Sequence, residues 1–548
     1  MGDVPQRVSA LLEECTRPDA GAAWLLCDRH PADAVAIALI DEDLSVVELT
    51  YGALREASER AAAGLAQLGV GPGDRVATLM GKCQELLATM LGVWRLGAVY
   101  VPLFTAFGPQ AVAMRLTDTD AKVVVVDPDQ RAKLDPGPDV PADAGWQIAV
   151  NGEAAGDDRA LADLLASEPL ASDAYAGGGD HPFVHMLTSG TTGRPKGVVH
   201  PLAYVADWLA YHEFSLGLRS DDAFWLAADP GWAYGLYGAI IAPLAMGIPS
   251  HVLCGGFSAE RTFAVLRDRK ITNFAAAPTV YRALRTAGLD TSGIRLRCAA
   301  SAGEPLTPEV NEWAREALGA TVHDHYGQTE LGMVAGNHQH PDVARPIKDG
   351  SMGQALPGWT LVVLQEDADE PAPVDTLGRL AVDIPASPLM TFERYQHESG
   401  ASAKISPDGR WYVTGDAARQ DADGDIFFSA RDDDVIIMAG YRIGPFDVES
   451  VLAQHEAVAE CAVIAVPDEA RGEVIEAVVV TRSGHAPSDE LARELQQLVK
   501  ERYAAHAYPR TVRFAPSLPK TESAKIQRVV LRRARVAELQ AAAGSGAS

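Results

Sequence analysis

The sequence is short of positive charge. Its 548 residues include 47 lysines and arginines against 74 aspartates and glutamates, which gives a formal net charge of −27. Broad nucleic-acid binding needs a basic face that neutralises phosphates, and attraction to an anionic membrane surface needs one too. The charge balance therefore predicts no nucleic-acid partner and no electrostatic binding to membranes.

Cysteines and long apolar runs are scarce as well. The six cysteines lie far apart and form no CxxC or Cys/His cluster, so neither a zinc site nor a disulfide framework is indicated. The longest purely apolar run, residues 34–40, is much too short to span a bilayer. We therefore expect reduced thiols, a cytoplasmic protein and no integral membrane association.

Strand-like and helix-like segments alternate along most of the chain. Up to about residue 350, apolar β-branched runs alternate with apolar residues at helical spacing, which predicts α/β layering with mostly parallel sheets. From about 350 to 430, short strands separated by Asp, Gly and Pro turns predict a small β-rich subdomain. We expect an α/β protein with a large N-terminal domain (1–432), containing two mostly parallel sheets and this subdomain, and a small α+β C-terminal domain (433–548).

The stretch LTSGTTGRPKGVVH, from Leu187 to His200, has the composition of a phosphate-binding loop. Its hydroxyl groups can donate hydrogen bonds, its glycines let backbone N–H groups approach phosphate oxygens, and its cations add positive charge. It is not a Walker A motif, because Gly197 rather than Ser or Thr follows Lys196. The residues predicted to contact phosphate are Thr188, Ser189, Gly190, Thr191, Thr192, Gly193 and Lys196.

Five further stretches extend this signal in a fixed order. They are SAGEPL (301–306), HDHYGQTELG (323–332), YVTGD (412–416), ARDDDVIIMAGYRIGPFDVES (430–450) and LPKTESAKIQR (518–528). With the loop, they resemble the motifs of the adenylate-forming enzymes, and GYRIGPFDVE and KIQR resemble the short- and medium-chain, acetyl-CoA-synthetase-like branch. The resemblance implies that ATP and a carboxylic acid give an acyl-adenylate and pyrophosphate, after which coenzyme A gives acyl-CoA and AMP.

The resemblance also implies roles for individual residues. Glu330 would hold Mg²⁺ beside the phosphates, and Thr329 would donate a hydrogen bond to the α-phosphate. Asp416 would accept from the ribose hydroxyls with Arg431 nearby, and Tyr326 would offer its ring face to the adenine. The other residues expected to bind ATP are Gly303, Glu304, Pro305, Asp324, His325, Gly327 and Gln328.

Lys525 is the expected catalytic residue of the adenylation step. A lysine near the end of the chain can offset the charges of the carboxylate and the α-phosphate as they meet. In this resemblance the C-terminal domain is mobile and swings about Asp433, so that Gly440, Tyr441 and Arg442 line the coenzyme A tunnel in the second step.

The segment ADPGWAYGLYG (228–238) resembles the substrate wall of the family. It carries no basic residue, which disfavours dicarboxylic acids. Acetate enzymes of the family have a tryptophan where this chain has Gly327, so the glycine predicts room for a short- or medium-chain fatty acid or a bulkier branched or aryl acid. The residues expected to line the acyl pocket are Trp232, Ala233, Tyr234 and Gly327.

Two other interpretations remain open at the level of sequence. The acyl group could pass to the pantetheine arm of a carrier protein, and a basic patch on the C-terminal domain, where several arginines follow residue 527, would favour that acceptor. The chain could also be a non-catalytic nucleotide-binding relative, but Lys525 and Glu330 are both present. A homodimer is compatible with either interpretation.

Overall fold

A seven-stranded sheet forms the N-terminal part of the large domain. The computed structural model describes residues 3–170, 172–188, 195–431, 434–438, 441–468, 472–504, 507–521 and 525–545. The strand order is β7 (Arg159–Ala160), β6 (Gln147–Val150), β5 (Ala121–Val126), β3 (Arg75–Leu79), β4 (Val99–Pro102), β8 (Pro182–Thr188) and β9 (Lys196–Pro201). Neighbouring strands are parallel except β8 and β9, which form an antiparallel hairpin.

Helices cover both faces of this first sheet. Val76 and Tyr100 point to the face packed by α2 (Tyr51–Gln67), α3 (Gln84–Arg95) and α5 (Leu161–Leu165). Ala77 and Val101, the next residues along the same strands, point to the face covered by α4 (Pro109–Asp118). Burial on both faces explains why the central strands are almost wholly apolar.

A second, nine-stranded sheet lies beside the first. Its order is β16 (Gln354–Ala355), β15 (Gly332–Gly336), β14 (Val322–Gln328), β13 (Cys298–Ala302), β12 (Asn273–Ala276), β10 (Phe224–Ala227), β11 (Ser250–Leu253), β1 (Val35–Ile40) and β2 (Val46–Thr50). The strands from β14 to β1 in this order are parallel, and the pairings at the two edges are antiparallel. Ligands of such sheets bind outside the carboxyl ends of the parallel strands, and the motif residues 301–306 and 323–330 lie at the ends of β13 and β14.

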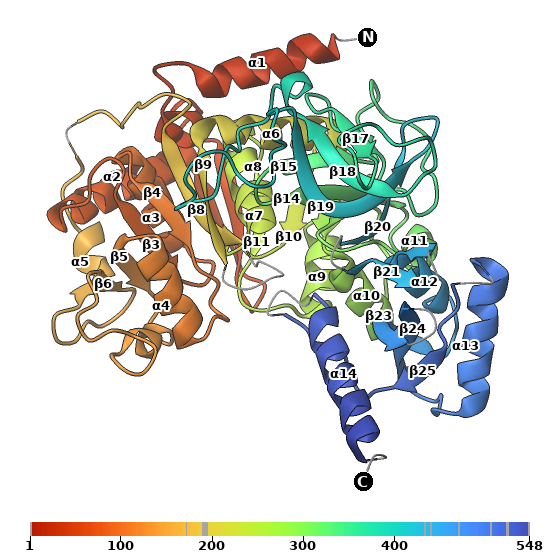
Figure 1. Ribbon diagram of the computed structural model, residues 1–548. Coiled ribbons are helices and arrows are strands. Elements are labelled where there is room, and N and C mark those ends of the chain that lie inside the picture. The colour runs from red at the N-terminus through yellow and green to blue at the C-terminus, as the bar shows by residue number, and fades with distance from the viewer. Residues whose placement is uncertain are drawn as a thin grey trace.

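Two helix layers enclose the second sheet. One face packs against α9 (Ala259–Asp268), α10 (Pro278–Ala287) and α11 (Pro308–Ala317). The other packs against α6 (Val205–Ala210) and α8 (Ala242–Met246), with the short α7 (Ala233–Gly235) nearby. Helix α1 (Val4–Thr16) packs outside α6 (Figure 1).

In the chain, an antiparallel sheet of four strands comes after the nine-stranded sheet and before the C-terminal unit. Its strands are β17 (Leu361–Leu364), β18 (Gly378–Asp383), β19 (Trp411–Gln420) and β20 (Ile426–Arg431). Another sheet begins after the chain leaves β20, and contains β22 (Tyr441–Ile443), β21 (Ile436–Met438), β24 (Gly472–Thr481), β23 (Val458–Asp468) and β25 (Thr511–Phe514). The change of sheet falls between Arg431 and Ile436, around the predicted domain boundary.

Three helices complete the C-terminal unit. Helices α12 (Pro445–Leu452) and α13 (Asp489–Arg502) share one hydrophobic core with its sheet, and α14 (Arg528–Ser545) packs on the other face. Figure 1 shows this unit beside the end of the large domain that carries α9, α10 and α11, with α12 close to β20. The predicted α/β class, with mostly parallel sheets, a β-rich part and a small C-terminal unit, is confirmed. No helix in the described ranges is both long and apolar enough to cross a bilayer.

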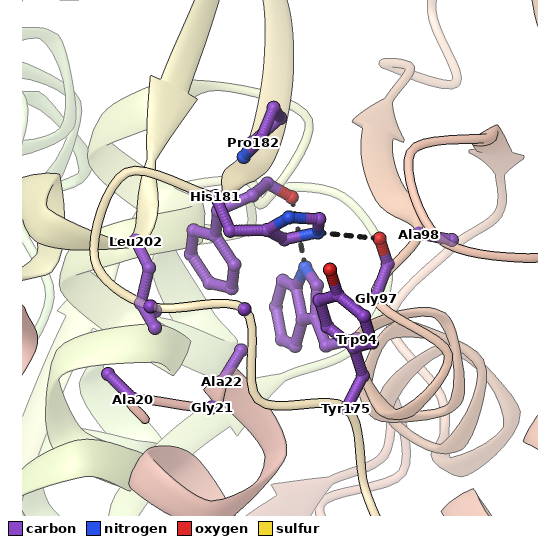
Figure 2. A pocket seen from close by; sticks show the side chains of 13 residues that line it. Ala20, Gly21, Ala22, Trp94, Gly97, Ala98, Tyr175, His181, Pro182 and Leu202 are labelled. Carbon is purple, nitrogen blue, oxygen red and sulfur yellow. Dashed lines mark hydrogen bonds between the residues drawn. The ribbon is translucent and has the colours of Figure 1, made fainter. Parts of the chain in front are cut away.

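A small cavity near the N-terminal sheet results from imperfect packing between side chains. Figure 2 shows Trp94, Tyr175 and His181 around it. His181 Nε2 is hydrogen-bonded to the carbonyl oxygen of Gly97 at 2.7 Å, and Trp94 Nε1 donates to the carbonyl oxygen of Phe183 at 3.1 Å. The volume of about 10 Å³ holds at most one water molecule, so we exclude this cavity as a ligand site.

Candidate active site

The predicted phosphate loop joins the two strands of the β8–β9 hairpin. Thr188 and Lys196 face each other as the last pair of the ladder. Lys196 Nζ lies 3.5 Å from Glu398 Oε1 and 4.5 Å from the centroid of the Tyr395 ring. The other predicted loop contacts lie outside the described residues: Ser189, Gly190, Thr191, Thr192 and Gly193.

The backbone at Thr329 is fixed by two aromatic side chains of the large domain. Its carbonyl oxygen is hydrogen-bonded to His200 Nε2 at 2.7 Å and accepts from the Tyr204 hydroxyl at 2.9 Å. The two rings stack at 3.9 Å between centroids, with planes 4° apart. His200 is the last residue of the phosphate-loop stretch, so this contact ties that stretch to the turn that carries Thr329 and Glu330.

Glu330 offers a single carboxylate that suits an incoming magnesium ion. Its side chain is buried, and Oε1 accepts a hydrogen bond from the Tyr395 hydroxyl, while Oε2 receives none from any described residue. Burial and the Glu330 charge raise the pKa of the Tyr395 hydroxyl, so it stays a donor. The described residues contain no group of three or more His, Cys, Asp or Glu arranged for a metal, and Mg²⁺ that arrives with phosphates needs only one or two carboxylates.

Asp416 is the centre of a hydrogen-bond network between β14, β19 and β20. Its Oδ2 accepts from the Tyr326 hydroxyl and from Gln328 Nε2, and its Oδ1 accepts from Arg431 Nη1 at 2.9 Å. The register of the β19–β20 hairpin places Asp416 directly opposite Arg431. A carboxylate has about four acceptor positions, so at least one remains for a further donor.

The segment after β13 presents open backbone next to a paired carboxylate. Gly303 has φ +95°, and a Cβ at this position would meet no atom of the described residues within 4 Å. Glu304 accepts hydrogen bonds from Thr279 Oγ1 and Arg282 Nη2. Gly303, Glu304 and Pro305 lie at the carboxyl end of β13 in the second sheet.

Asp324 lies at a polar cavity of about 340 Å³ between α11 and the loop 347–351. Its Oδ1 is buried without a hydrogen-bond partner among the described residues, and burial raises the pKa of its carboxyl group to about 8. The neighbouring His325 is a core group, because its ring nitrogens are bonded to the Tyr211 hydroxyl and to the carbonyl oxygen of Asn337. Of the two, Asp324 therefore has an acceptor without a partner among the described residues, in a side chain that lines the cavity.

The structure corrects the interpretation of Gly327 as space for a larger acid. A Cβ at this position would lie 2.1 Å from the carbonyl oxygen of Gly332 and 2.7 Å from Met333 Sδ. The β14–β15 register shifts between Tyr326 and Gly327, and this irregularity brings the two backbones together. The glycine thus serves close strand packing, and its missing side chain does not by itself enlarge an acyl pocket.

The predicted acyl wall is strongly aromatic. The Trp232 ring packs between Phe104 and Phe107, with centroids 5.4 and 5.5 Å away. The Tyr234 hydroxyl is 3.0 Å from the Tyr211 hydroxyl, and Ala233 begins α7. Trp232 thereby connects the second sheet to the first, whereas Tyr234 belongs to the core around α6.

Lys525 is held at the interface between the C-terminal unit and the large domain. Its side chain remains accessible to solvent, yet the surrounding protein desolvates its ammonium and lowers the pKa, an effect that the Glu304 and Asp416 charges oppose and Arg431 reinforces. The backbone of Lys525 is fixed to Thr521, whose N–H donates to its carbonyl oxygen at 2.8 Å and whose Oγ1 accepts from its N–H at 3.1 Å. The charge of Lys525 thus acts on Glu304, which lies more than two hundred residues earlier in the chain.

Only some of the residues predicted to form the hinge and to bind coenzyme A lie among the described residues. Asp433 and Gly440 lie outside the described residues, and Tyr441 and Arg442 are described as backbone in β22. The contact between the domains is nevertheless clear, because the Ser429 hydroxyl donates to Asp447 Oδ2 and links β20 to α12.

Sequence reasoning missed several residues of this site. Tyr395 and Lys404 lie in the segment before the YVTGD motif, where no spacing or composition distinguishes them. Lys404 is partly buried near Glu330 and Asp416. His200 could have been noted, since it ends the phosphate-loop stretch.

Comparisons with known proteins agree with this geometry. Residues 26–391 match the family model described as AMP-binding enzyme, and residues 447–525 match AMP-binding enzyme C-terminal domain. The chain is 36% identical over 530 residues to an acetyl-coenzyme A synthetase of Bacillus subtilis (strain 168), covering 93% of this chain and 90% of the relative.

Two solved structures extend the similarity over nearly the whole chain. An acyl-CoA synthetase from Brucella canis is 42% identical, with a TM-score of 0.75 and 97% of each chain covered. The anthranilate CoA ligase AuaEII in complex with anthranoyl-AMP is 27% identical, with a TM-score of 0.83, and covers 96% of this chain and 99% of its own.

The family models, the relatives and the similar solved structures thus agree on acyl-CoA synthetase activity. The interpretation as a non-catalytic nucleotide-binding protein does not fit them. The substrates and cofactors of that activity are a carboxylic acid, ATP, Mg²⁺ and coenzyme A. The chain belongs to the AMP-binding enzyme family, and it is an AMP-forming acyl-CoA synthetase.

Proposed function

We propose that the acid is adenylated between the carboxyl ends of β13 and β14, β19 and Lys525, in the domain arrangement described above. The observation that carries this proposal is that Lys525 lies within electrostatic range of Glu304, Arg431 and Asp416. A cation brought from the second domain to a cluster containing two carboxylates suits a reaction in which two anions must meet.

In the first half-reaction, a carboxylate oxygen of the acid attacks the α-phosphorus, and the bond to the β-phosphate oxygen breaks. Lys525 offsets the charges that converge, and Asp416 accepts from the ribose hydroxyls. Asp324 accepts from the amino group of the adenine, a role supported by its Oδ1, which has no hydrogen-bond partner among the described residues. Glu330 holds Mg²⁺, which supplies positive charge to the phosphates. Lys196 and Thr188 bind the phosphates that leave as pyrophosphate.

In the second half-reaction, the C-terminal domain swings about Asp433 and removes Lys525. The bond between Ser429 and Asp447 must break in this movement, since it joins the two domains. Gly440, Tyr441 and Arg442 then line the path of the coenzyme A thiol. One site thereby serves two reactions in turn.

Coenzyme A suits the acceptor role better than a carrier protein does. Several of the late arginines, which would have formed a docking patch for an acidic carrier, are paired within the chain. Arg532 Nη2 donates to Glu473 at 2.6 Å, and Arg535 Nε donates to Glu476 at 2.9 Å. Much of the basic surface on α14 is therefore neutralised.

A reducing, cytoplasmic location is supported by the cysteines. All six are free thiols. Burial raises the pKa of Cys15 and Cys27 to about 12, so these two stay protonated and unreactive.

In this proposal the acid is a short- or medium-chain, branched or aryl monocarboxylic acid without a second charged group. The wall segment 228–238 is mostly apolar and aromatic, with Asp229 as its one charged residue, and it carries no lysine or arginine. Relatives named for acetate and for anthranilate bracket this range. Because the glycine at position 327 serves strand packing, it does not indicate which acid of this range is the substrate.

A panel of acids tests this assignment. We expect thioesters, identified by mass, from straight-chain, branched and aryl monocarboxylic acids, with kcat/KM changing about 10- to 200-fold per added or lost methylene. Malonate and succinate should be poor substrates, because their second carboxylate would be buried without a cation. A clear preference for a dicarboxylic acid would contradict the proposed acyl wall.

A further inference from the structure

Lys404 is anchored to the strand that carries Asp416. The N–H of Val413 donates to the Lys404 carbonyl oxygen at 2.8 Å, and Ile405 bridges to Tyr412. The ammonium itself donates to the carbonyl oxygen of Thr414 at 2.8 Å. Both ends of this lysine are therefore fixed by the first residues of β19.

The ammonium of Lys404 lies over the Tyr412 ring, 5.3 Å from its centroid, and does not use all of its donors. Thr414 is the one hydrogen-bond acceptor that the described residues offer it, although an ammonium carries three donors. Desolvation lowers its pKa, Glu330 and Asp416 act against this shift, and Arg431 and Lys196 add to it. The ammonium therefore keeps donors for an anionic ligand, and it lies within electrostatic range of Glu330 and Asp416.

The other cations of the site are differently placed. Arg431 is bonded to Asp416, and Lys196 is half-exposed beside Glu398. Lys525 belongs to the C-terminal domain and leaves in the proposed swing. Lys404 belongs to the large domain and stays.

We propose that Lys404 binds a non-bridging oxygen of the α-phosphate and holds it through the thioester-forming step. This inference rests on the proposed adenylation site, in which Glu330 faces the phosphates and Asp416 faces the ribose. In ATP the α-phosphate links the ribose to the β- and γ-phosphates. It therefore lies between Asp416 and Glu330, where the unused donors of Lys404 can bind it.

The second half-reaction explains why a resident cation is useful. The thiol sulfur bonds to the acyl carbon, the bond from that carbon to the phosphate oxygen breaks, and the electron pair stays on the oxygen. The thiol proton passes to solvent. The phosphate gains one negative charge as AMP leaves, at a time when Lys525 is absent, and Lys404 stabilises that charge.

The experiment compares Lys404→Met with wild type in two assays. Single-turnover thioester formation from purified acyl-adenylate and coenzyme A should fall about 10- to 100-fold, because a hydrogen bond to a charged group is lost. Binding of AMP, measured by calorimetry, should weaken over the same range. Lys404→Arg should restore part of both values, since it keeps the charge.

Matched variants separate this role from a structural one. Lys122→Met removes a surface lysine whose Nζ lies 2.8 Å from Asp74, and both values should stay at wild-type levels. Lys404→Gln keeps a donor to Thr414, and it should show the same defect as Lys404→Met with an unchanged thermal unfolding midpoint. Wild-type AMP binding and thioester formation in the Lys404 variants would overturn the inference. Failure of wild type to use any acyl-adenylate would instead overturn the proposed function.

Discussion

Replacing Lys525 with alanine is expected to lower acid-dependent ATP–pyrophosphate exchange about 100- to 1,000-fold. Lys525, a residue of the C-terminal domain, lies within electrostatic range of Glu304, Asp416 and Arg431 of the large domain. Without its charge, the acid and the α-phosphate would repel each other as they meet. The measurement is the exchange of labelled pyrophosphate into ATP at saturating acid.

The same variant should still make thioester from a supplied acyl-adenylate, because Lys525 has no part in the second step. Lys520→Ala is the matched control, since Lys520 Nζ pairs with Glu460 at 2.6 Å on the surface of the same domain and such exposed pairs contribute little. An exchange rate in Lys525→Ala equal to that of the control would show that the adenylation step does not depend on this lysine.

Replacing Gly327 with alanine is expected to destabilise the large domain by about 1–3 kcal/mol. The added Cβ would lie 2.1 Å from the carbonyl oxygen of Gly332 and 2.9 Å from the Cα of Met333. Both are backbone atoms, so β14 and β15 must separate to make room. The thermal unfolding midpoint of the purified variant measures the effect.

Gly145→Ala provides the control, because in the part of the chain that the structure describes a Cβ there would meet no atom within 4 Å. Its midpoint should match wild type. Gly327→Trp should fold poorly or not at all. A well-folded Gly327→Trp enzyme with a preference shifted toward acetate would restore the interpretation that this position sets the size of the acyl pocket.

Gly327 illustrates where sequence reasoning stops. A glycine in a motif suggests empty space where a side chain would be. In the folded chain, another segment can fill that space. Here it is the backbone of β15, after a register shift between Tyr326 and Gly327. Such a local irregularity has no periodic signal in the sequence.

Other parts of the site could be predicted because short-range patterns determine them. The hairpin of β8 and β9 follows from apolar runs on both sides of the phosphate loop, and it pairs Thr188 with Lys196. Alternating apolar segments likewise predicted the parallel sheets, whose strand ends carry the motifs. The facing pair of Asp416 and Arg431 lies on one hairpin, where local pairing brings two predicted residues together.

Long-range contacts account for what was missed. Tyr395 reaches Glu330 from sixty-five residues away, and Lys404 lies in a turn without a distinguishing pattern. The arginines of α14 suggested a basic patch, whereas the structure pairs Arg532 and Arg535 with glutamates on β24. These partners depend on how the sheets and helices pack, which composition does not reveal.

The central claim is that the acid is joined to the α-phosphate of ATP before it reaches coenzyme A. The most direct test supplies an accepted acid labelled with ¹⁸O in its carboxylate, together with ATP, Mg²⁺ and coenzyme A, and analyses the nucleotide product by mass spectrometry. We predict that one labelled oxygen appears in the phosphate of AMP for each acyl-CoA formed, since the attacking oxygen stays on phosphorus when the thiol displaces AMP. Formation of ADP, with the label in inorganic phosphate, would contradict the account.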